Sequence, residues 1–241
     1  MKIHTIIIVL LYSTFLWFEG VSQNIIINPY LQDASPDKLT IMWETDDVGI
    51  GEVHYGTSPF NLNSVMQSTS ITGSGLSRIH TAELSSLNTG TKYYYKVIME
   101  NSQESQLYTF VTPHAHSEEK STQLMAMSDM QRDGSHPDKF REIVEDGIIP
   151  IIFSEIGPSI NNLEAVMIPG DLVVTGGNYL QWKDHFFNPS DSLFSYVPLY
   201  PVPGNHEYSG GGLPNFIKYF TLPENGATGL EEQCWYKDIS N

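Results

Sequence analysis

Hydrophobic and polar residues alternate along several short stretches in the first half of the chain. Between residues 39 and 45, the alternation places Leu39, Ile41 and Trp43 on one face, which is the period of a half-buried strand. Turn residues separate this run from similar ones, which are Ile25–Tyr30, Glu52–Gly56, Thr91–Val97 and Gln106–Val111. Short strands with turn signals between them predict an all-β, antiparallel sandwich over residues of about 24–112.

The second half of the chain changes to short apolar runs separated by helical patterns. The runs that predict strands are Gln123–Ser128, Ala165–Ile168 and Leu199–Val202, the first of them as a central parallel strand. Helices are expected from Pro137, with an interruption at Gly147 and Pro150, and over Tyr179–Phe187 and Pro214–Phe220. This order predicts an incomplete α/β domain over residues 123–241, joined to the sandwich by a polar linker at 113–122.

The first 23 residues have the pattern of a secretory signal peptide. Lys2 and His4 give a basic start, residues 6–18 are mostly apolar, and small and polar residues follow. A membrane anchor is the alternative, but the apolar core is short for a bilayer span. We therefore expect a secreted, periplasmic or cell-surface protein with no stable membrane span after signal cleavage.

Composition narrows the class of protein. Of 241 residues, 40% are hydrophobic and 17% charged, which favours a packed globular chain. The 28 acidic and 12 basic residues give a formal charge of −16, which repels nucleic-acid phosphates, so we expect no nucleic-acid-binding module. The single cysteine, Cys234, excludes an internal disulfide and is interpreted as a small buried residue rather than a nucleophile.

Polar residues follow each of the three predicted strands of the second half. Because the carboxyl ends of parallel strands meet at one edge of a sheet, these residues are expected to converge. Viewed singly, the aspartates could be turn or helix-capping residues, Asn205 could close a turn, and His206 could be a loop histidine. Together their oxygen and nitrogen atoms predict a metal site. The residues are Asp129 and Gln131, then Gly170 and Asp171, then Gly204, Asn205, His206 and Glu207.

The sandwich carries a family resemblance. Residues 87–95 have the pattern of a tyrosine corner, in which a phenol hydroxyl bonds to nearby backbone. With Asn28–Gln32 and Val53–Gly56, the module resembles a fibronectin type III domain, and more narrowly the N-terminal domain that precedes the catalytic domain of purple acid phosphatases.

The ordered motifs of the second half resemble those of the calcineurin-like metallophosphoesterases. The resemblance implies two metal ions, with Fe, Zn or Mn as the expected elements. It implies that Asp129 holds the first metal, Asp171 bridges both, and Asn205 holds the second. Gln131 stands where many relatives place a histidine and is expected to be a weaker ligand.

The resemblance also implies a reaction. Water activated to hydroxide by the metals would attack the phosphorus of a phosphate ester. His206 would contact the phosphoryl oxygens or protonate the leaving alkoxide, and Glu207 would hydrogen-bond the other imidazole nitrogen. The expected protein is an acid-phosphatase-like phosphomonoesterase. The alternatives are a phosphodiesterase or nucleotidase of the same superfamily, or a non-catalytic surface-binding protein on the same scaffold.

Two departures from the family pattern matter. Purple acid phosphatases place a tyrosine three residues after the bridging aspartate, where this chain has Val174, so we expect no purple iron chromophore. No histidine follows His206, so the family's later histidine motifs are missing. We therefore expect a C-terminally truncated fragment with half of the ligand set, which binds metal weakly and is inactive alone.

Overall fold

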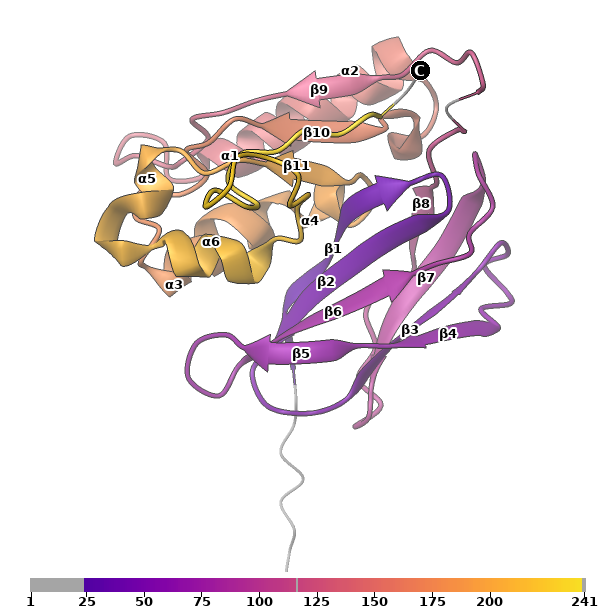
Figure 1. The fold of residues 1–241 in the computed structure, drawn as a ribbon, viewed down its shortest axis with the longest axis horizontal. Coiled ribbons are helices and arrows are strands. Elements are labelled where there is room, and N and C mark those ends of the chain that lie inside the picture. Colours follow the sequence, from indigo (N-terminus) through magenta and orange to yellow (C-terminus); the bar gives the residue numbers. More distant parts are fainter. Residues whose placement is uncertain (1–23, 116, 240–241) are drawn as a thin grey trace, which may run out of the picture.

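Two antiparallel sheets pack face to face in the first part of the computed structural model, which describes residues 24–115 and 117–239 (Figure 1). The predicted signal peptide therefore lies outside the described residues. One sheet has the order β1 (Ile25–Ser35), β2 (Lys38–Thr45), β6 (Arg78–Leu84) and β5 (Thr69–Thr72), and the other β4 (Ser64–Gln67), β3 (Gly51–Gly56), β7 (Lys92–Met99) and β8 (Tyr108–Val111). The predicted sandwich is confirmed, with Trp43, Tyr95 and Phe110 fully buried in its core.

The tyrosine corner is confirmed at Tyr93. Its hydroxyl accepts a hydrogen bond from the backbone N–H of Asn88, at 2.9 Å. The short strands β4 and β5 were not predicted. Every residue of β5 is exposed, so no buried face gives it the alternation by which a strand is found in a sequence.

A three-stranded parallel sheet follows, in the order β11 (Leu199–Pro201), β10 (Ala165–Ile168) and β9 (Leu124–Ala126). The predicted parallel pairing is confirmed. The prediction of a central first strand is wrong for the described sheet, because β10 is central and β9 lies at the edge. Leu124 on β9 is accordingly half exposed, whereas β10 is almost entirely buried.

Helical segments surround this sheet, and none in the described residues is long and apolar enough to cross a bilayer. The segments η1, η2 and η4 are π-helical and η3 and η5 are 3₁₀-helical. The first run is α1 (Lys139–Glu142), η1 (Ile143–Ile148), α2 (Ile149–Ile151) and η2 (Ile152–Ile156), followed by η3 (Ile160–Asn162). The others are α3 (Tyr179–Gln181), η4 (Trp182–Phe187) and α4 (Asn188–Phe194), and α5 (Asn205–Tyr208), η5 (Ser209–Gly211) and α6 (Leu213–Tyr219).

The expected interruption at Gly147 and Pro150 is wrong. The backbone stays helical from α1 through η2, with φ of −60° at Ile149 and −55° at Ile152. Proline cannot donate the hydrogen bond of a regular α-turn, and its ring crowds the carbonyl four residues earlier. The π-helical turns on both sides widen the bonding pattern, so the run continues past Pro150.

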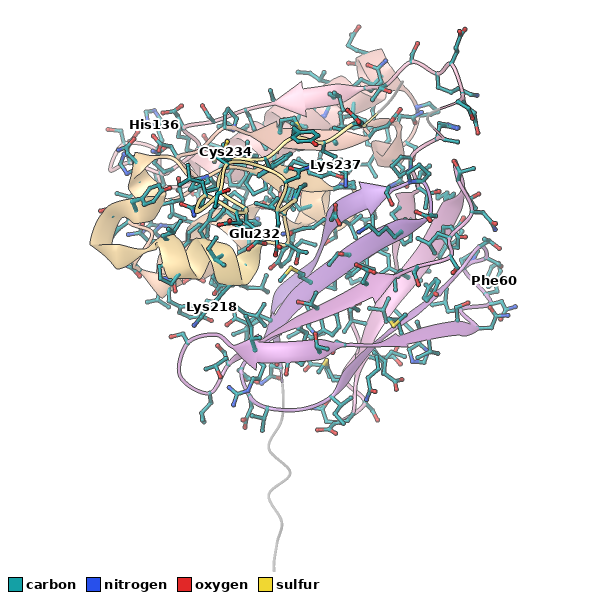
Figure 2. All side chains as sticks on the ribbon, viewed as in Figure 1. Phe60, His136, Lys218, Glu232, Cys234 and Lys237 are labelled. Carbon is teal, nitrogen blue, oxygen red and sulfur yellow. The ribbon has the colours of Figure 1, made fainter. Side chains whose placement is uncertain are left out.

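The interpretation of Cys234 as a buried residue is also wrong. Cys234 is exposed, in a segment near the end of the described chain that forms no strand. Figure 2 labels it in the same C-terminal segment as Glu232 and Lys237. This segment is anchored by neighbours instead, since Trp235 packs against Tyr200 with ring centroids 5.9 Å apart.

The sandwich and the α/β module share a hydrophobic core. Ile27, Tyr30, Met42 and Ile79 belong to sandwich strands but are buried with residues of the α/β module. The ring of Tyr30, for example, lies 4.5 Å from that of Phe187. The two modules are therefore held together by burial of apolar surface as well as by polar contacts.

The stretch Asn28–Gln32, which carries part of the family resemblance, forms much of this interface. The Tyr30 hydroxyl donates to the carbonyl of Tyr219 at 2.8 Å. The Gln32 amide donates to the same carbonyl at 3.1 Å and accepts from Thr221 N–H at 2.5 Å. The resemblance at these positions therefore has a structural cause, which is docking of the sandwich onto the module that follows it.

Replacing Gln32 with alanine is expected to destabilise the protein. Gln32 is fully buried, and its loss leaves the Thr221 N–H without its partner and removes a donor to Tyr219. The free energy of unfolding should fall by about 2–4 kcal/mol, measured by urea denaturation. Gln67→Ala, at an exposed position of β4, is the matched control. Equal values for the two variants would contradict this role of Gln32.

Glu44 predicts a pH dependence of stability. It is buried at the interface and accepts hydrogen bonds from Ser77 Oγ at 2.6 Å and the Tyr219 hydroxyl at 3.0 Å. Burial raises the pKa of this carboxyl above its ordinary value of 4.5, although both hydroxyls act in the opposite direction. The folded protein thus holds this proton more tightly than the unfolded chain does. The stabilisation is complete below the ordinary pKa and is lost as pH rises through the raised pKa.

The variant Glu44→Gln isolates this effect. As pH rises from 4.5, the wild type loses the stabilisation from protonated Glu44, so the variant should become more stable relative to the wild type. Urea denaturation at a series of pH values measures it. A difference that stays constant with pH would show that Glu44 does not titrate abnormally.

Candidate metal centre

The predicted ligands lie at one edge of the parallel sheet. Asp129, Asp171 and Asn205 each follow the carboxyl end of a strand, namely β9, β10 and β11. Because these strands are parallel, their carboxyl ends open at the same edge. Figure 1 shows α5, which begins at Asn205, beside the loops that follow β9 and β10.

Asp129 and Asp171 have the same unusual backbone conformation. Both have φ of 57°, in the left-handed region that residues other than glycine seldom adopt. Aspartate tolerates this region better than most residues, but the conformation still carries strain. Its occurrence after two neighbouring strands supports a functional role for these loops.

Gly170 and Gly204 bring two of the loops into direct contact. A Cβ atom on Gly170 would lie 2.7 Å from the Cα of Gly204, and Gly170 also has φ of 97°. A Cβ atom on Gly204 would lie 2.2 Å from Oδ1 of Asp171. Both positions therefore require glycine, which explains the Gly-Asp and Gly-Asn pairs in the sequence.

Gln131 connects the first loop to the second. With its nitrogen facing the carbonyl oxygens, the amide donates to Asp129 O at 3.0 Å and to Asp171 O at 3.2 Å. The amide oxygen then remains for a cation. Lys139 Nζ also donates to the carbonyl of Asp129, at 2.6 Å. These bonds hold Asp129, Gln131 and Asp171 in one cluster.

Glu207 has a different role from the one expected. It is fully buried, and its carboxylate accepts four backbone hydrogen bonds. Oε2 accepts from the N–H groups of Asp171 and Gly204, each at 2.8 Å, and Oε1 from Leu172 and Val173 at 2.8 and 3.2 Å. Glu207 thus joins the loop after β10 to the loop after β11.

The expected hydrogen bond between Glu207 and His206 is wrong. His206 Nδ1 lies 2.7 Å from the carbonyl of Val174, and a carbonyl can only accept, so Nδ1 carries a proton. This leaves Nε2 to contact a ligand. The backbone N–H of His206 lies 3.4 Å from Asp171 Oδ1, so the histidine is held close to the predicted bridging carboxylate.

Sequence comparison adds two matches. The model of the purple acid phosphatase N-terminal domain matches residues 25–112, and that of the calcineurin-like phosphoesterases matches residues 122–238. The second half of the chain belongs to the calcineurin-like phosphoesterases. A comparison with curated protein sequences finds no significant match.

Solved structures show the same fold. The purple acid phosphatase PPD1 from yellow lupin (Lupinus luteus) seeds is 20% identical, with a TM-score of 0.66 over 88% of this chain and 42% of its own. PhoD is 10% identical, with a TM-score of 0.53 over 77% of this chain and 40% of its own. The present chain thus spans less than half the length of either protein.

The family implies metal ions, and the residues present fit them in part. Asp129, Asp171, Gln131 and Asn205 offer two carboxylates and two amide oxygens, the hard donors that divalent cations such as Mn²⁺ accept. Among residues 24–115 and 117–239, however, no three His, Cys, Asp or Glu side chains are grouped so that they could hold a metal. The ligand set of this calcineurin-like domain therefore remains a prediction.

Proposed function

We propose that the full-length protein is a metal-dependent phosphomonoesterase with a dinuclear centre. The observation that carries the proposal is that the residues after β9, β10 and β11 meet at one sheet edge, with Gln131 bonded to the loops of Asp129 and Asp171. The match to the calcineurin-like phosphoesterases supports the reaction class. The sequence pattern of residues 1–23 supports a secreted, periplasmic or cell-surface location.

The residues of the chain divide the work as follows. Asp129 and Gln131 would hold the first metal, Asp171 would be shared by both, and Asn205 would hold the second. When bound, two metals supply a hydroxide nucleophile at neutral pH and neutralise charge on the phosphoryl group. Glu207 acts through the backbone, because it fixes the positions of Asp171 and Gly204.

His206 acts on the substrate. Its Nδ1–H bond to Val174 fixes the ring, so that Nε2 is the atom that meets the phosphoryl group. A protonated Nε2 can donate to a phosphoryl oxygen and then transfer its proton to the leaving alkoxide. Proton donation at this atom lowers the barrier because an alkoxide is a poor leaving group in water.

Hydrolysis of p-nitrophenyl phosphate by the full-length protein tests this proposal. Turnover should require added Mn²⁺ or Zn²⁺ and be abolished by EDTA. Bis(p-nitrophenyl) phosphate, assayed in parallel, reports on phosphodiesterase activity, and a preference for it would overturn the monoesterase assignment. Absence of turnover on both esters with every metal would favour a non-catalytic binding protein.

The iron-loaded protein is expected to lack a strong visible absorption band. Val174, three residues after Asp171, cannot supply the phenolate whose charge transfer to iron gives purple acid phosphatases their colour. Absorption spectroscopy of the iron-loaded wild type measures this, with Val174→Tyr as the comparison variant. A strong visible band in the wild type would show that another group replaces the missing phenolate.

A further inference from the structure

An open cavity of about 590 Å³ lies beside the candidate metal centre. Its lining includes Arg132 and Val174, which connect it to that centre. Arg132 directly follows Gln131, and the carbonyl of Val174 accepts the Nδ1–H bond of His206. A cavity of this volume accommodates a small organic molecule. It therefore lies where the organic part of a phosphate ester would extend from the metals.

Arg132 brings an unpaired positive charge to this cavity. Its guanidinium forms no hydrogen bond or ion pair with another described residue, although the protein carries a formal charge of −16. The adjacent carboxylate, Asp133, also lines the cavity, but its oxygen atoms are engaged by neighbouring donors of its own loop. It accepts from the N–H groups of Ser135 at 2.8 Å and His136 at 2.9 Å, and contacts His136 Nδ1 at 3.1 Å. Figure 2 shows His136 on this edge of the molecule, next to α5.

A second cation that follows in the sequence, Lys139, is already engaged. Lys139 Nζ donates to the carbonyls of Asp129 and Gln131, at 2.6 and 3.5 Å, so it supports the metal loop and does not line the cavity. Arg132 is thus the permanently charged cation of the cavity wall. A guanidinium is well suited to bind a carboxylate or phosphate through two parallel hydrogen bonds.

The facing wall comes from the helical run of α3 and η4. Gln181 and His185 lie one helical turn apart and both line the cavity. The Gln181 side-chain oxygen accepts from Thr175 N–H at 2.8 Å, which fixes the amide and leaves its nitrogen as a donor. Burial and the charge of Arg132 lower the pKa of His185, so its imidazole is neutral at neutral pH. Pro137 and Val174 add apolar surface.

We propose that this cavity binds the leaving group of phosphomonoesters that carry a second anionic group, with Arg132 as the specificity-determining residue. The cavity supplies one unpaired cation, polar side chains that can donate, and an apolar surface for a short organic linker. The inference rests on the proposed function, since it assigns the substrate class of that same site. Either a carboxylate or a second phosphate would satisfy the guanidinium.

Three substrates of the metal-loaded, full-length protein test the inference. Phenyl phosphate has no second anionic group. The organic part of meta-carboxyphenyl phosphate carries a carboxylate, and that of benzene-1,3-diyl bis(phosphate) carries a second phosphate. The ratio of kcat/KM for each anionic ester to that for phenyl phosphate should fall about 10- to 100-fold in Arg132→Ala, mainly through KM. Arg132→Lys should restore part of the ratio, because it keeps the charge but not the paired hydrogen bonds.

Arg141→Ala is the matched control. Arg141 is exposed, pairs with Glu145 at 3.5 Å and does not line the cavity, so its loss should leave the ratios unchanged. An Arg132→Ala ratio that stays at the wild-type value for both anionic esters would overturn the cavity assignment alone. Wild-type protein that hydrolyses none of the three esters would overturn the proposed function and this inference with it. A response confined to one ester identifies the anion that the cavity accepts.

Discussion

Replacing Asp171 with asparagine is expected to lower kcat/KM for p-nitrophenyl phosphate by more than about 100-fold. Mutating a residue that only supports a metal ligand already lowers metal affinity or activity by about 10- to 100-fold, and Asp171 is assigned as a ligand itself. Asp171 is the carboxylate that we assign to both metals, and an amide brings no negative charge to offset their mutual repulsion. Its Oδ1 also lies 3.4 Å from the His206 N–H, so the charge sits beside the group assigned to the phosphoryl oxygens. The measurement is steady-state hydrolysis by the Mn²⁺-loaded, full-length protein.

The matched control for this variant is Asp184→Asn. Asp184 is an exposed aspartate that contacts Lys183 at 3.1 Å and does not belong to the predicted centre, so its loss should leave turnover near the wild-type value. Thermal unfolding of both variants separates loss of chemistry from loss of fold. Wild-type turnover in Asp171→Asn would rule out the two-metal assignment.

The variant Glu207→Gln is expected to lower the free energy of unfolding by about 2–5 kcal/mol. Each oxygen of the Glu207 carboxylate accepts two backbone N–H bonds. In glutamine, one of these oxygens becomes an NH₂ group, which would face two N–H donors that cannot accept a hydrogen bond. The loops after β10 and β11 would then separate, and Mn²⁺ affinity should fall about 10- to 100-fold.

Glu44→Gln is the control for burial of a carboxylate. Its partners Ser77 and Tyr219 are hydroxyls, which can rotate and accept a hydrogen bond from the new amide, so the cost should be smaller. Urea denaturation and titration calorimetry with Mn²⁺ measure stability and affinity for both variants. A Glu207→Gln protein with wild-type stability and impaired turnover would instead favour a direct role beside His206.

The sandwich could be predicted from the sequence because its signals are local. Alternation around Trp43 predicts the strand β2, and the spacing between Asn88 and Tyr93 predicts the tyrosine corner; both elements are confirmed. The half-buried character of β2 is wrong, because its second face, with Met42 and Glu44, is also buried. The order of the parallel strands cannot be predicted from short windows of sequence, because it depends on pairing between segments far apart in the sequence. The run at Gln123–Ser128 is as apolar as a central strand, yet pairing places β9 at the edge of the described sheet.

The candidate centre could likewise be predicted only in part. That Asp129, Asp171 and Asn205 lie at one edge follows from parallel pairing alone and was predicted. The role of Glu207 was missed because its partners, residues 171–173, lie 34 to 36 positions away and meet it only in the fold. One local signal was available. A glutamate at the third position of a helix often accepts a hydrogen bond from the N–H of the residue that precedes the helix. Glu207 accepts from Gly204 in this way.

The core shared by the two modules has a consequence for how the protein is made. A ribosome synthesises the sandwich first, and that domain has a core of its own around Trp43 with which to fold early. Until the helices that follow β10 emerge, Ile27, Tyr30, Met42 and Ile79 face solvent as an uncovered apolar surface. A chaperone would therefore find a binding surface on the incomplete chain until the α/β module packs over these four residues.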